Sequence, residues 1–334
     1  VTEAGAGDII AVAKLAVTQT NDTLGEEARP MILEPVSFPA PVYSVAVNPK
    51  AKGDEEKIGS GLQRLAEEDS TFTVRRDPVT AEIIISGLGE THVDVMIERL
   101  KRKFGVDAVL SEPKVAYKET IRGKAQGEYK HKKQSGGRGQ YGHCKIEIEP
   151  LFEGEYEFVD KIFAGAIPLN FRPAVDKGVQ ETMAEGVLAG YPVTGVRCTL
   201  LDGSYHDVDS SEMAFKIAAR NAFKIAFMNA KPVLLEPIMR LEVIVPESYM
   251  GDIMGDLNKK RGRIAGMEPT GDGKQIIRAS APLAELHRYA IDLRSMTQGR
   301  GQFTMEFDHY EEAPAQVAKA VIDAAAASRK EEAE

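Results

Sequence analysis

The chain has 334 residues, of which 43% are hydrophobic and 28% charged, the proportions of an ordinary globular protein with two or three domains. Its net charge is −9, no apolar run approaches the roughly 20 residues that cross a bilayer, and no signal peptide opens it, which argues against a membrane or secreted protein. Two isolated cysteines, Cys144 and Cys198, argue against a disulfide framework and a zinc knuckle, and a reducing cytoplasm is therefore expected.

Residues 1–35 alternate short apolar runs, such as 9–12 and 15–17, with a turn cluster at 20–23. This pattern suits the last strands of a β-barrel whose earlier strands lie outside the sequence. The opening residues already resemble the inside of a domain, so we expect the chain to be part of a longer protein.

Residues 36–112 predict the order strand, helix, strand, strand, helix, strand, with helices at about 54–68 and 90–103. The second helix places Val93, Met96 and Leu100 on one face, at the spacing of an amphipathic helix. This is the order of a ferredoxin-like split βαβ domain.

Residues 237–312 repeat that order. A constant offset of 195 aligns Glu90-Thr-His92 with Glu285-Leu-His287, and both histidines are interpreted as structural rather than as ligands. We therefore expect two ferredoxin-like domains to flank the middle of the chain.

The middle, 113–236, predicts an α+β domain of a different kind. Pro173 stands where a helix would begin, and a second helix at about 212–229 is apolar nearly all round and is expected to be buried. A C-terminal helix at 313–328 carries Val317, Ala320, Val321 and Ala324 on one face and should pack on this domain.

A basic, glycine-rich stretch at 127–144 stands out in the middle domain. Between Lys114 and Cys144, eight Lys or Arg residues accompany two Asp or Glu, whereas the other 303 residues sum to −15. Cations on a glycine-rich backbone can fit phosphates, and aromatic side chains such as Tyr129 and Tyr141 can stack on unpaired bases. The stretch predicts an RNA contact; a solvated hairpin loop remains the alternative.

His206 lies in the run Ser204-Tyr-His-Asp-Val-Asp209, which suggests a nucleophilic triad or a metal site. Three triad members within six residues cannot easily converge, and no further ligands are spaced to complete a metal shell. We expect instead that Asp209 or Ser210 caps the following helix with support from Glu212, and that His206 is exposed for binding.

A second basic cluster consists of Lys259, Lys260, Arg261 and Arg263 at the end of a predicted helix. These cations either offset the helix dipole or bind phosphate. The sequence contains no P-loop, no dinucleotide-binding glycine motif and no nucleophile elbow. No catalytic residue and no metal ligand is predicted, and the residues alone indicate a non-catalytic, RNA-binding protein.

The run Lys133-Gln-Ser-Gly-Gly-Arg-Gly-Gln-Tyr-Gly-His143, together with Gly203-Ser-Tyr-His-Asp-Val-Asp-Ser-Ser-Glu212, closely resembles bacterial translation elongation factor G. The resemblance implies that 1–35 is the tail of the barrel domain II and 36–112 is domain III. It also implies that 113–236 is domain IV, with a fold like domain 2 of ribosomal protein S5, and that 237–312 is domain V. The family's GTPase domain, which binds GTP and Mg²⁺, would lie outside this sequence, so no cofactor is expected here.

In that family the factor binds the ribosome and moves tRNA and mRNA by one codon, and the tip of domain IV enters the decoding region. The resemblance assigns the RNA contact at that tip to Gln134, Ser135, Gly136, Gly137, Arg138, Gly139, Gln140, Tyr141, Ser204, Tyr205, His206 and Asp207. Less specific basic contacts would come from Lys130, Lys132, Lys133, Lys259, Lys260, Arg261 and Arg263. Its partners would be rRNA of both subunits, tRNA and mRNA, and the protein would be a cytoplasmic monomer.

The sequence departs from the common family pattern at Gly87-Leu-Gly-Glu-Thr-His92, Cys144 and Asp202. These departures suggest a paralogue, so a translational GTPase specialised in ribosome recycling or ribosome protection is the alternative. An enzyme that uses His206 with Asp207 is the rival from another class.

Overall fold

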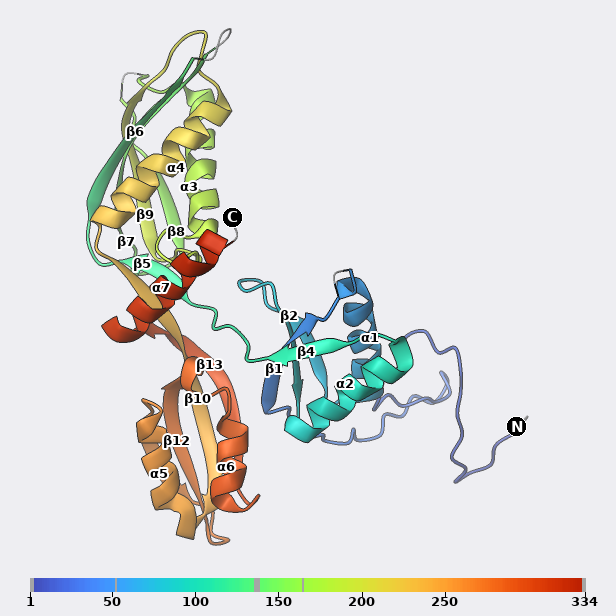
Figure 1. Cartoon of the computed structure of the whole chain (residues 1–334). Helices are drawn as coiled ribbons and strands as arrows, with labels where there is room; N and C mark the ends of the chain where they lie inside the picture. The colour runs from blue at the N-terminus through green and yellow to red at the C-terminus, as the bar shows by residue number, and fades with distance from the viewer. Residues whose placement is uncertain (1–2, 52, 135–138, 164, 332–334) are drawn as a thin grey trace. The chain divides into compact units, whose positions relative to one another are not determined.

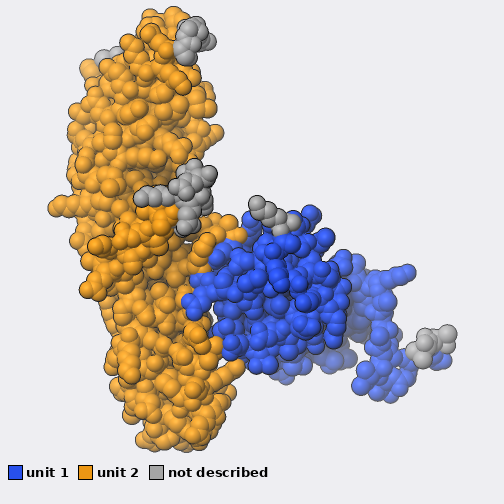
Figure 2. Space-filling model, in the orientation of Figure 1, with its two compact units in different colours: residues 1–77, 82–113 blue, residues 78–81, 114–334 orange. Residues whose placement is uncertain are grey.

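The computed structural model describes residues 3–51, 53–134, 139–163 and 165–331, without the side chains of 328, 330 and 331 (Figure 1). It divides the chain into two compact units (Figure 2). Unit 1 comprises 1–77 and 82–113, and unit 2 comprises 78–81 and 114–334. Each unit has its own sheets and its own core.

Unit 1 confirms the predicted ferredoxin-like order. Its elements are β1 (Tyr43–Pro49), α1 (Glu55–Glu68), β2 (Thr73–Arg76), β3 (Ile83–Gly87), α2 (Glu90–Phe104) and β4 (Ala108–Ser111). The strands form an antiparallel sheet in the order β2-β3-β1-β4. Both helices bury the faces that the sequence predicted, and a Cβ on Gly61 would lie 2.6 Å from Leu100 Cδ1. This glycine therefore lets α1 approach α2 closely.

The barrel strands predicted at the start of unit 1 do not form among the described residues. Residues 3–42 contain no helix or strand, and Ile9 and Val17 are exposed. Side-chain hydrogen bonds instead hold parts of the segment together, as where Asn21 bonds to the backbone of Val36. A strand needs a neighbour for its backbone N–H and C=O groups, and no described strand pairs with this segment.

The first part of unit 2 is a four-stranded sheet in the order β6-β7-β9-β8, with α3 and α4 on one face (Figure 1). Its elements are β6 (Ala125–Lys133), β7 (Gln140–Pro150), β8 (Tyr156–Asp160), α3 (Arg172–Glu185), β9 (Val196–Ser204) and α4 (Glu212–Asn229). β8 runs parallel to β9, and the other neighbours are antiparallel. This is the α+β middle domain that the sequence predicted.

Glycines of the basic stretch bring α4 against the sheet. A Cβ on Gly127 would lie 2.0 Å from Ala222 O, and one on Gly142 would lie 2.5 Å from Ala214 O. Gly142 therefore has a packing role, which corrects its interpretation as part of a pliant loop. The prediction that α4 is buried all round is also wrong, because Ile225 is 41% exposed; the helix buries one face, which contains Phe215, Phe223 and several alanines.

The second part of unit 2 is a sheet in the order β11-β12-β10-β13, with β5 paired to the start of β10. Its elements are β5 (Lys118–Ile121), β10 (Pro232–Pro246), α5 (Met250–Lys259), β11 (Arg263–Pro269), β12 (Lys274–Pro282), α6 (Tyr289–Thr297) and β13 (Gln302–Glu312). The predicted boundary at 236–237 falls inside β10, so one continuous strand belongs to both parts.

The C-terminal helix α7 (Ala315–Glu331) packs mainly on residues between 115 and 234, within the range 113–236 that the sequence assigned to the middle domain. It packs Val317, Val321 and Ile322 against a cluster that includes Tyr117 and Leu234. The predicted face is partly wrong: Ala320 and Ala324 are exposed, because Ala318 and Ala325 take the inner positions instead.

Candidate nucleic-acid interface

The basic stretch forms a long hairpin rather than a loop. β6 and β7 pair from Ala125 opposite Ile148 to Lys133 opposite Gln140, which leaves only 134–139 for the turn. Four predicted contact residues, Ser135, Gly136, Gly137 and Arg138, lie outside the described residues. Alternating apolar and polar positions along 140–149, with the even-numbered positions buried from 142 to 148, were the sequence signal for this strand.

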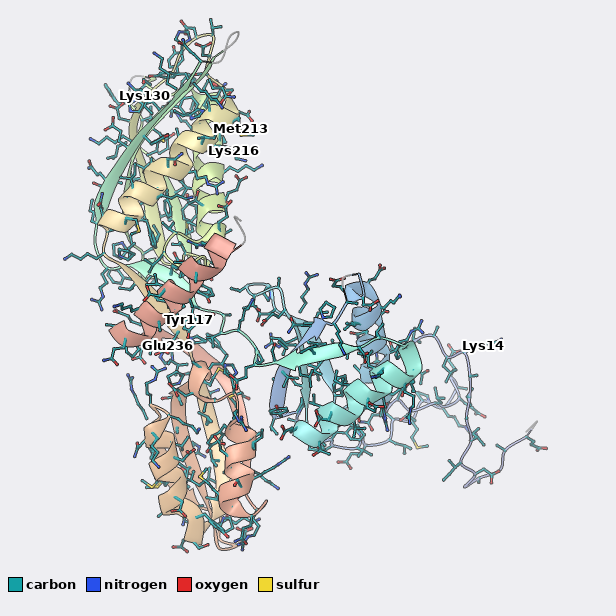
Figure 3. All side chains as sticks on the ribbon, in the orientation of Figure 1. Lys14, Tyr117, Lys130, Met213, Lys216 and Glu236 are labelled. Carbon is teal, nitrogen blue, oxygen red and sulfur yellow. The ribbon has the colours of Figure 1, made fainter. Side chains whose placement is uncertain are left out.

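Three exposed lysines lie in β6 near the turn. Lys130 and Lys132 are two residues apart and therefore project from one face of the sheet, whereas Lys133 projects from the other. Figure 3 shows Lys130 towards the same end of the sheet as Met213 at the start of α4. No carboxylate of the described residues lies within ion-pair distance of these three ammonium groups. Their charges are therefore available to an external anion.

The β6–β7 turn and the β9–α4 loop are joined by direct hydrogen bonds. Gly139 N donates to Asp209 Oδ1 at 3.0 Å, and Tyr141 N donates to Asp209 O at 2.9 Å. Ser210 Oγ donates to Tyr141 O at 3.0 Å and accepts from His206 N at 2.9 Å. The structure thus brings the predicted residues Gly139, Tyr141 and His206 to one end of the middle domain.

His206 is half exposed, with 54% of its side chain accessible. Its Nδ1 lies 3.3 Å from Val208 N and 3.2 Å from Asp209 N, so it accepts hydrogen bonds from these backbone groups. In the neutral imidazole the proton then sits on Nε2. This leaves the Nε2–H of a half-exposed ring as a donor for a ligand, with the ring of Tyr141 beside it at a centroid distance of 6.3 Å.

The N-terminal cap of α4 is not at the residues that the sequence predicted. Ser211, rather than Asp209 or Ser210, caps α4, because its hydroxyl accepts from Ala214 N at 3.2 Å. Asp209 and Ser210 point instead to the neighbouring turn, where their hydrogen bonds satisfy backbone groups of Gly139 and Tyr141. Sequence spacing alone could not separate these neighbours, since each of the three side chains can cap a helix.

A chain of hydrogen bonds beside the tip was missed from the sequence. His143 bonds to Ser204 Oγ through Nδ1 at 2.8 Å and to Glu128 Oε1 through Nε2 at 2.9 Å. Ser204 Oγ also lies 2.7 Å from the hydroxyl of Tyr141. The hydroxyl of Ser204 is thus engaged away from His206, and the triad considered for 204–209 does not form. The two-residue spacing of Tyr141 and His143 was the available signal, because it places both on one face of β7.

The described residues at the tip provide no metal site. They contain no group of three His, Cys, Asp or Glu side chains that could hold an ion. Tyr205 and Asp207, the remaining predicted residues of the β9–α4 loop, are exposed, as are Gln134 and Gln140 near the turn. The arrangement suits recognition by hydrogen bonds, charge and shape.

Ion pairs engage most of the second basic cluster. Lys260 Nζ lies 2.8 Å from Asp292 Oδ2, and Arg263 Nη1 lies 2.9 Å from Glu311 Oε1. Arg261 binds the buried carboxylate of Glu236 through two nitrogens at 2.7 and 2.9 Å. Lys259 is exposed and has no ion-pair partner among the described residues. Of the four cations, Lys259 is thus the most available to phosphate.

Three family models match the chain, one after another. Domain III of elongation factor G matches residues 38–112, domain IV matches 113–231, and the elongation factor G C-terminus matches 233–321. The chain belongs to the elongation factor G family. Translation-factor domains therefore make up residues 38–321, and the candidate interface is the tip of domain IV.

The chain is also similar to a solved structure of a protein from Thermus thermophilus. That protein is 43% identical to the chain, with a TM-score of 0.77, and the match covers 87% of this chain and 44% of that one. The chain thus spans less than half the length of that solved protein. Among the described residues, no helix is long and apolar enough to cross a bilayer.

Proposed function

We propose that this chain is the ribosome-binding part of a translation elongation factor G that promotes GTP-dependent movement of tRNA and mRNA. GTP and Mg²⁺ would bind a GTPase domain outside this sequence. The tip of domain IV would contact the tRNA–mRNA duplex in the decoding region. The observation that carries the proposal is the hydrogen-bonded connection between the β6–β7 hairpin and the β9–α4 loop. It brings lysines that have no ion-pair partner among the described residues to the same end of the domain as the exposed ring of His206.

The chemistry of the tip fits a duplex whose sequence changes at every codon. Such a duplex must be held by its backbone, since contacts to base edges would restrict the sequence. In double-stranded RNA the wide minor groove displays 2′-hydroxyls and is bordered by the phosphates of the backbone, and ammonium groups and a single imidazole N–H can bind both. Lys130, Lys132 and His206 supply these groups from a β-hairpin and a loop that are fixed to each other.

Salt-dependent binding tests the proposal. The full chain is titrated with ribosomes carrying mRNA and tRNA, beside a variant with Lys130, Lys132 and Lys133 replaced by Ala. Each lost phosphate contact should lower the slope of log affinity against log salt by about 0.7 to 0.9, so the variant should bind more weakly and with a smaller slope. A variant with alanine at Lys14, Lys50 and Lys319, exposed lysines far along the chain from the tip, controls for net charge.

Equal affinity of the tip variant and the native chain at low salt contradicts the proposal. The alternative role in recycling is distinguished by joining 1–334 to a GTPase domain of the family. Movement of tRNA on a pre-translocation ribosome supports translocation, whereas splitting of post-termination ribosomes without tRNA movement supports recycling.

A further inference from the structure

A third loop lies beside the two tip loops, although no motif in the sequence singles it out. Its described residues, 161–163 and 165–171, connect β8 to α3. Because β8 is parallel to β9, both strands end at the same end of the sheet, and Lys161 N donates to Leu200 O at 2.9 Å. Ile167 is fully buried, and a Cβ on Gly203 would lie 2.5 Å from its Cδ1. The third loop is therefore anchored next to the β9–α4 loop.

Arg172 fastens the two ends of the third loop to each other. Its Nε donates to Ile167 O at 3.0 Å, and its Nη1 lies 2.8 Å from Asp160 Oδ2. Asp160 Oδ1 also accepts from Ile162 N at 2.9 Å. At the far end, Phe171 stacks on Phe215 of α4 with ring centroids 5.0 Å apart. The apolar residues at the loop ends are thus used in the core.

By contrast, Phe163 and Leu169 of the same loop are not buried: their side chains are 87% and 75% exposed. Burying a Phe side chain is worth about 1.5–3 kcal/mol, and this fold does not use that stabilisation for Phe163. Single exposed apolar residues are common on protein surfaces. Here, however, Tyr205 and Val208 of the neighbouring β9–α4 loop are also exposed, so both loops present large apolar side chains to solvent.

We propose that Phe163 stacks on an unpaired nucleobase of the RNA that the neighbouring loops hold. The inference rests on the proposed function and extends it to a third loop. Aromatic side chains beside cationic groups are the usual means of holding unpaired bases, and each such stack is worth about 1–3 kcal/mol. Lys161 lies two residues from Phe163 and is exposed, so the same loop carries a cation that favours an anionic partner over an apolar protein groove.

An unpaired base is the required target, because a paired base inside a duplex has both faces covered by its neighbours. A nucleotide that flanks the duplex held by the other two loops meets this condition. The third loop would thus contact an unpaired nucleotide at the end of the duplex, whereas the lysines of β6 bind the backbone of the duplex.

Ring substitutions at Phe163 test stacking directly. Affinity of the full chain for ribosomes carrying mRNA and tRNA should fall about 5- to 150-fold for Phe163→Ala, the equivalent of one base stack. Phe163→Trp should restore binding because it keeps a flat ring, and Phe163→Leu should not. The matched control is Phe152→Ala: Phe152 is 96% exposed but follows β7 at the opposite end of the sheet, where Pro150 pairs with Val196.

A photo-crosslinking residue at position 163 identifies the partner. Crosslinks to RNA, mapped to an unpaired nucleotide, support the inference; crosslinks to a ribosomal protein, or native affinity for Phe163→Leu, overturn it. The two proposals fail separately. If the triple lysine variant loses affinity and Phe163→Ala does not, only the third-loop inference fails, whereas native affinity of the lysine variant refutes the proposed function.

Discussion

The carboxylate of Asp209 accepts a hydrogen bond from the backbone N–H of Gly139, at 3.0 Å and across 70 residues of sequence. The carbonyl of the same residue accepts from Tyr141 N at 2.9 Å. One residue of the β9–α4 loop therefore fixes the C-terminal end of the β6–β7 turn through two hydrogen bonds. His206, three residues earlier, is held at the same place because its Nδ1 accepts from Asp209 N.

Asp209→Ala should therefore weaken RNA binding even though it removes a negative charge. Loss of the side-chain acceptor leaves Gly139 N without its partner, so only the bonds of Tyr141 to Asp209 O and Ser210 Oγ still hold the turn beside His206. Asp209→Asn is the matched control, because its side-chain oxygen still accepts from Gly139 N while the charge is gone. We expect Asp209→Asn to bind ribosomes at least as tightly as the native chain, and Asp209→Ala several-fold more weakly.

Thermal unfolding followed by circular dichroism separates this effect from misfolding. Both Asp209 variants should unfold close to the native temperature, since Ser211 still caps α4. If Asp209→Ala binds more tightly than the native chain, charge rather than loop geometry governs the tip.

Periodicity predicted most of the fold because the buried faces of α1, α2 and α5 follow the helical repeat. It failed at 1–35, where apolar runs looked like strands but no described strand pairs with them. Strand formation depends on a distant partner, which local sequence does not reveal.

At the site, residue types predicted which segments matter but not what each residue does. Gly142 looked like a source of flexibility, yet its missing Cβ makes room for the backbone of α4. Arg261 looked like a phosphate ligand, yet it binds Glu236, whose burial the sequence could not show. Both roles arise from contacts between residues far apart in the chain.

Replacing Arg261 by Ala should destabilise the protein more than replacing Lys259 by Ala. Removing Arg261 leaves the carboxylate of Glu236 buried without its bidentate partner, and breaking such a pair costs about 3–5 kcal/mol. Lys259→Ala should change stability by less than about 0.5 kcal/mol, the usual effect of a surface substitution. Denaturant unfolding measures both variants.

The affinity for ribosomes gives a second comparison of the Lys259→Ala and Arg261→Ala variants. Lys259→Ala should lower the salt dependence of binding if domain V contacts phosphate, with no change in unfolding. An Arg261→Ala variant as stable as the native chain would contradict the structural role assigned to that ion pair.

Glu119 should be essential to the stability of unit 2. Its buried carboxylate accepts five backbone hydrogen bonds, from Val187, Leu188, Ala189, Gly190 and Tyr191, at 2.7–3.0 Å. Glu119→Gln turns an NH₂ group towards some of these donors and leaves them unpaired, at about 1–3 kcal/mol for each unsatisfied group. Urea unfolding and faster amide exchange at 187–191 should show the loss.

The control for Glu119 is Glu155→Gln. The carboxylate of Glu155 is exposed and pairs with Lys118 at 3.1 Å, so its loss should cost less than about 1 kcal/mol. Equal free energies of unfolding for the two variants would show that the five backbone hydrogen bonds do not stabilise unit 2.

The stability of unit 1 should depend on the ionisation of Asp69. Hydrogen bonds from the hydroxyl and the N–H of Thr71, with His92 Nε2 3.2 Å away, hold the pKa of this carboxyl below its usual value. A lowered pKa in the folded state stabilises the protein above the unfolded pKa of about 3.9, and this contribution is lost as the pH falls through the folded value. Asp69→Asn should therefore unfold more easily than the native chain at pH 6, and the difference should shrink below pH 4. Asp94→Asn, at an exposed position on α2, should follow the native curve throughout, and an Asp69→Asn difference that stays constant from pH 6 to pH 3 would rule out linkage to this carboxylate.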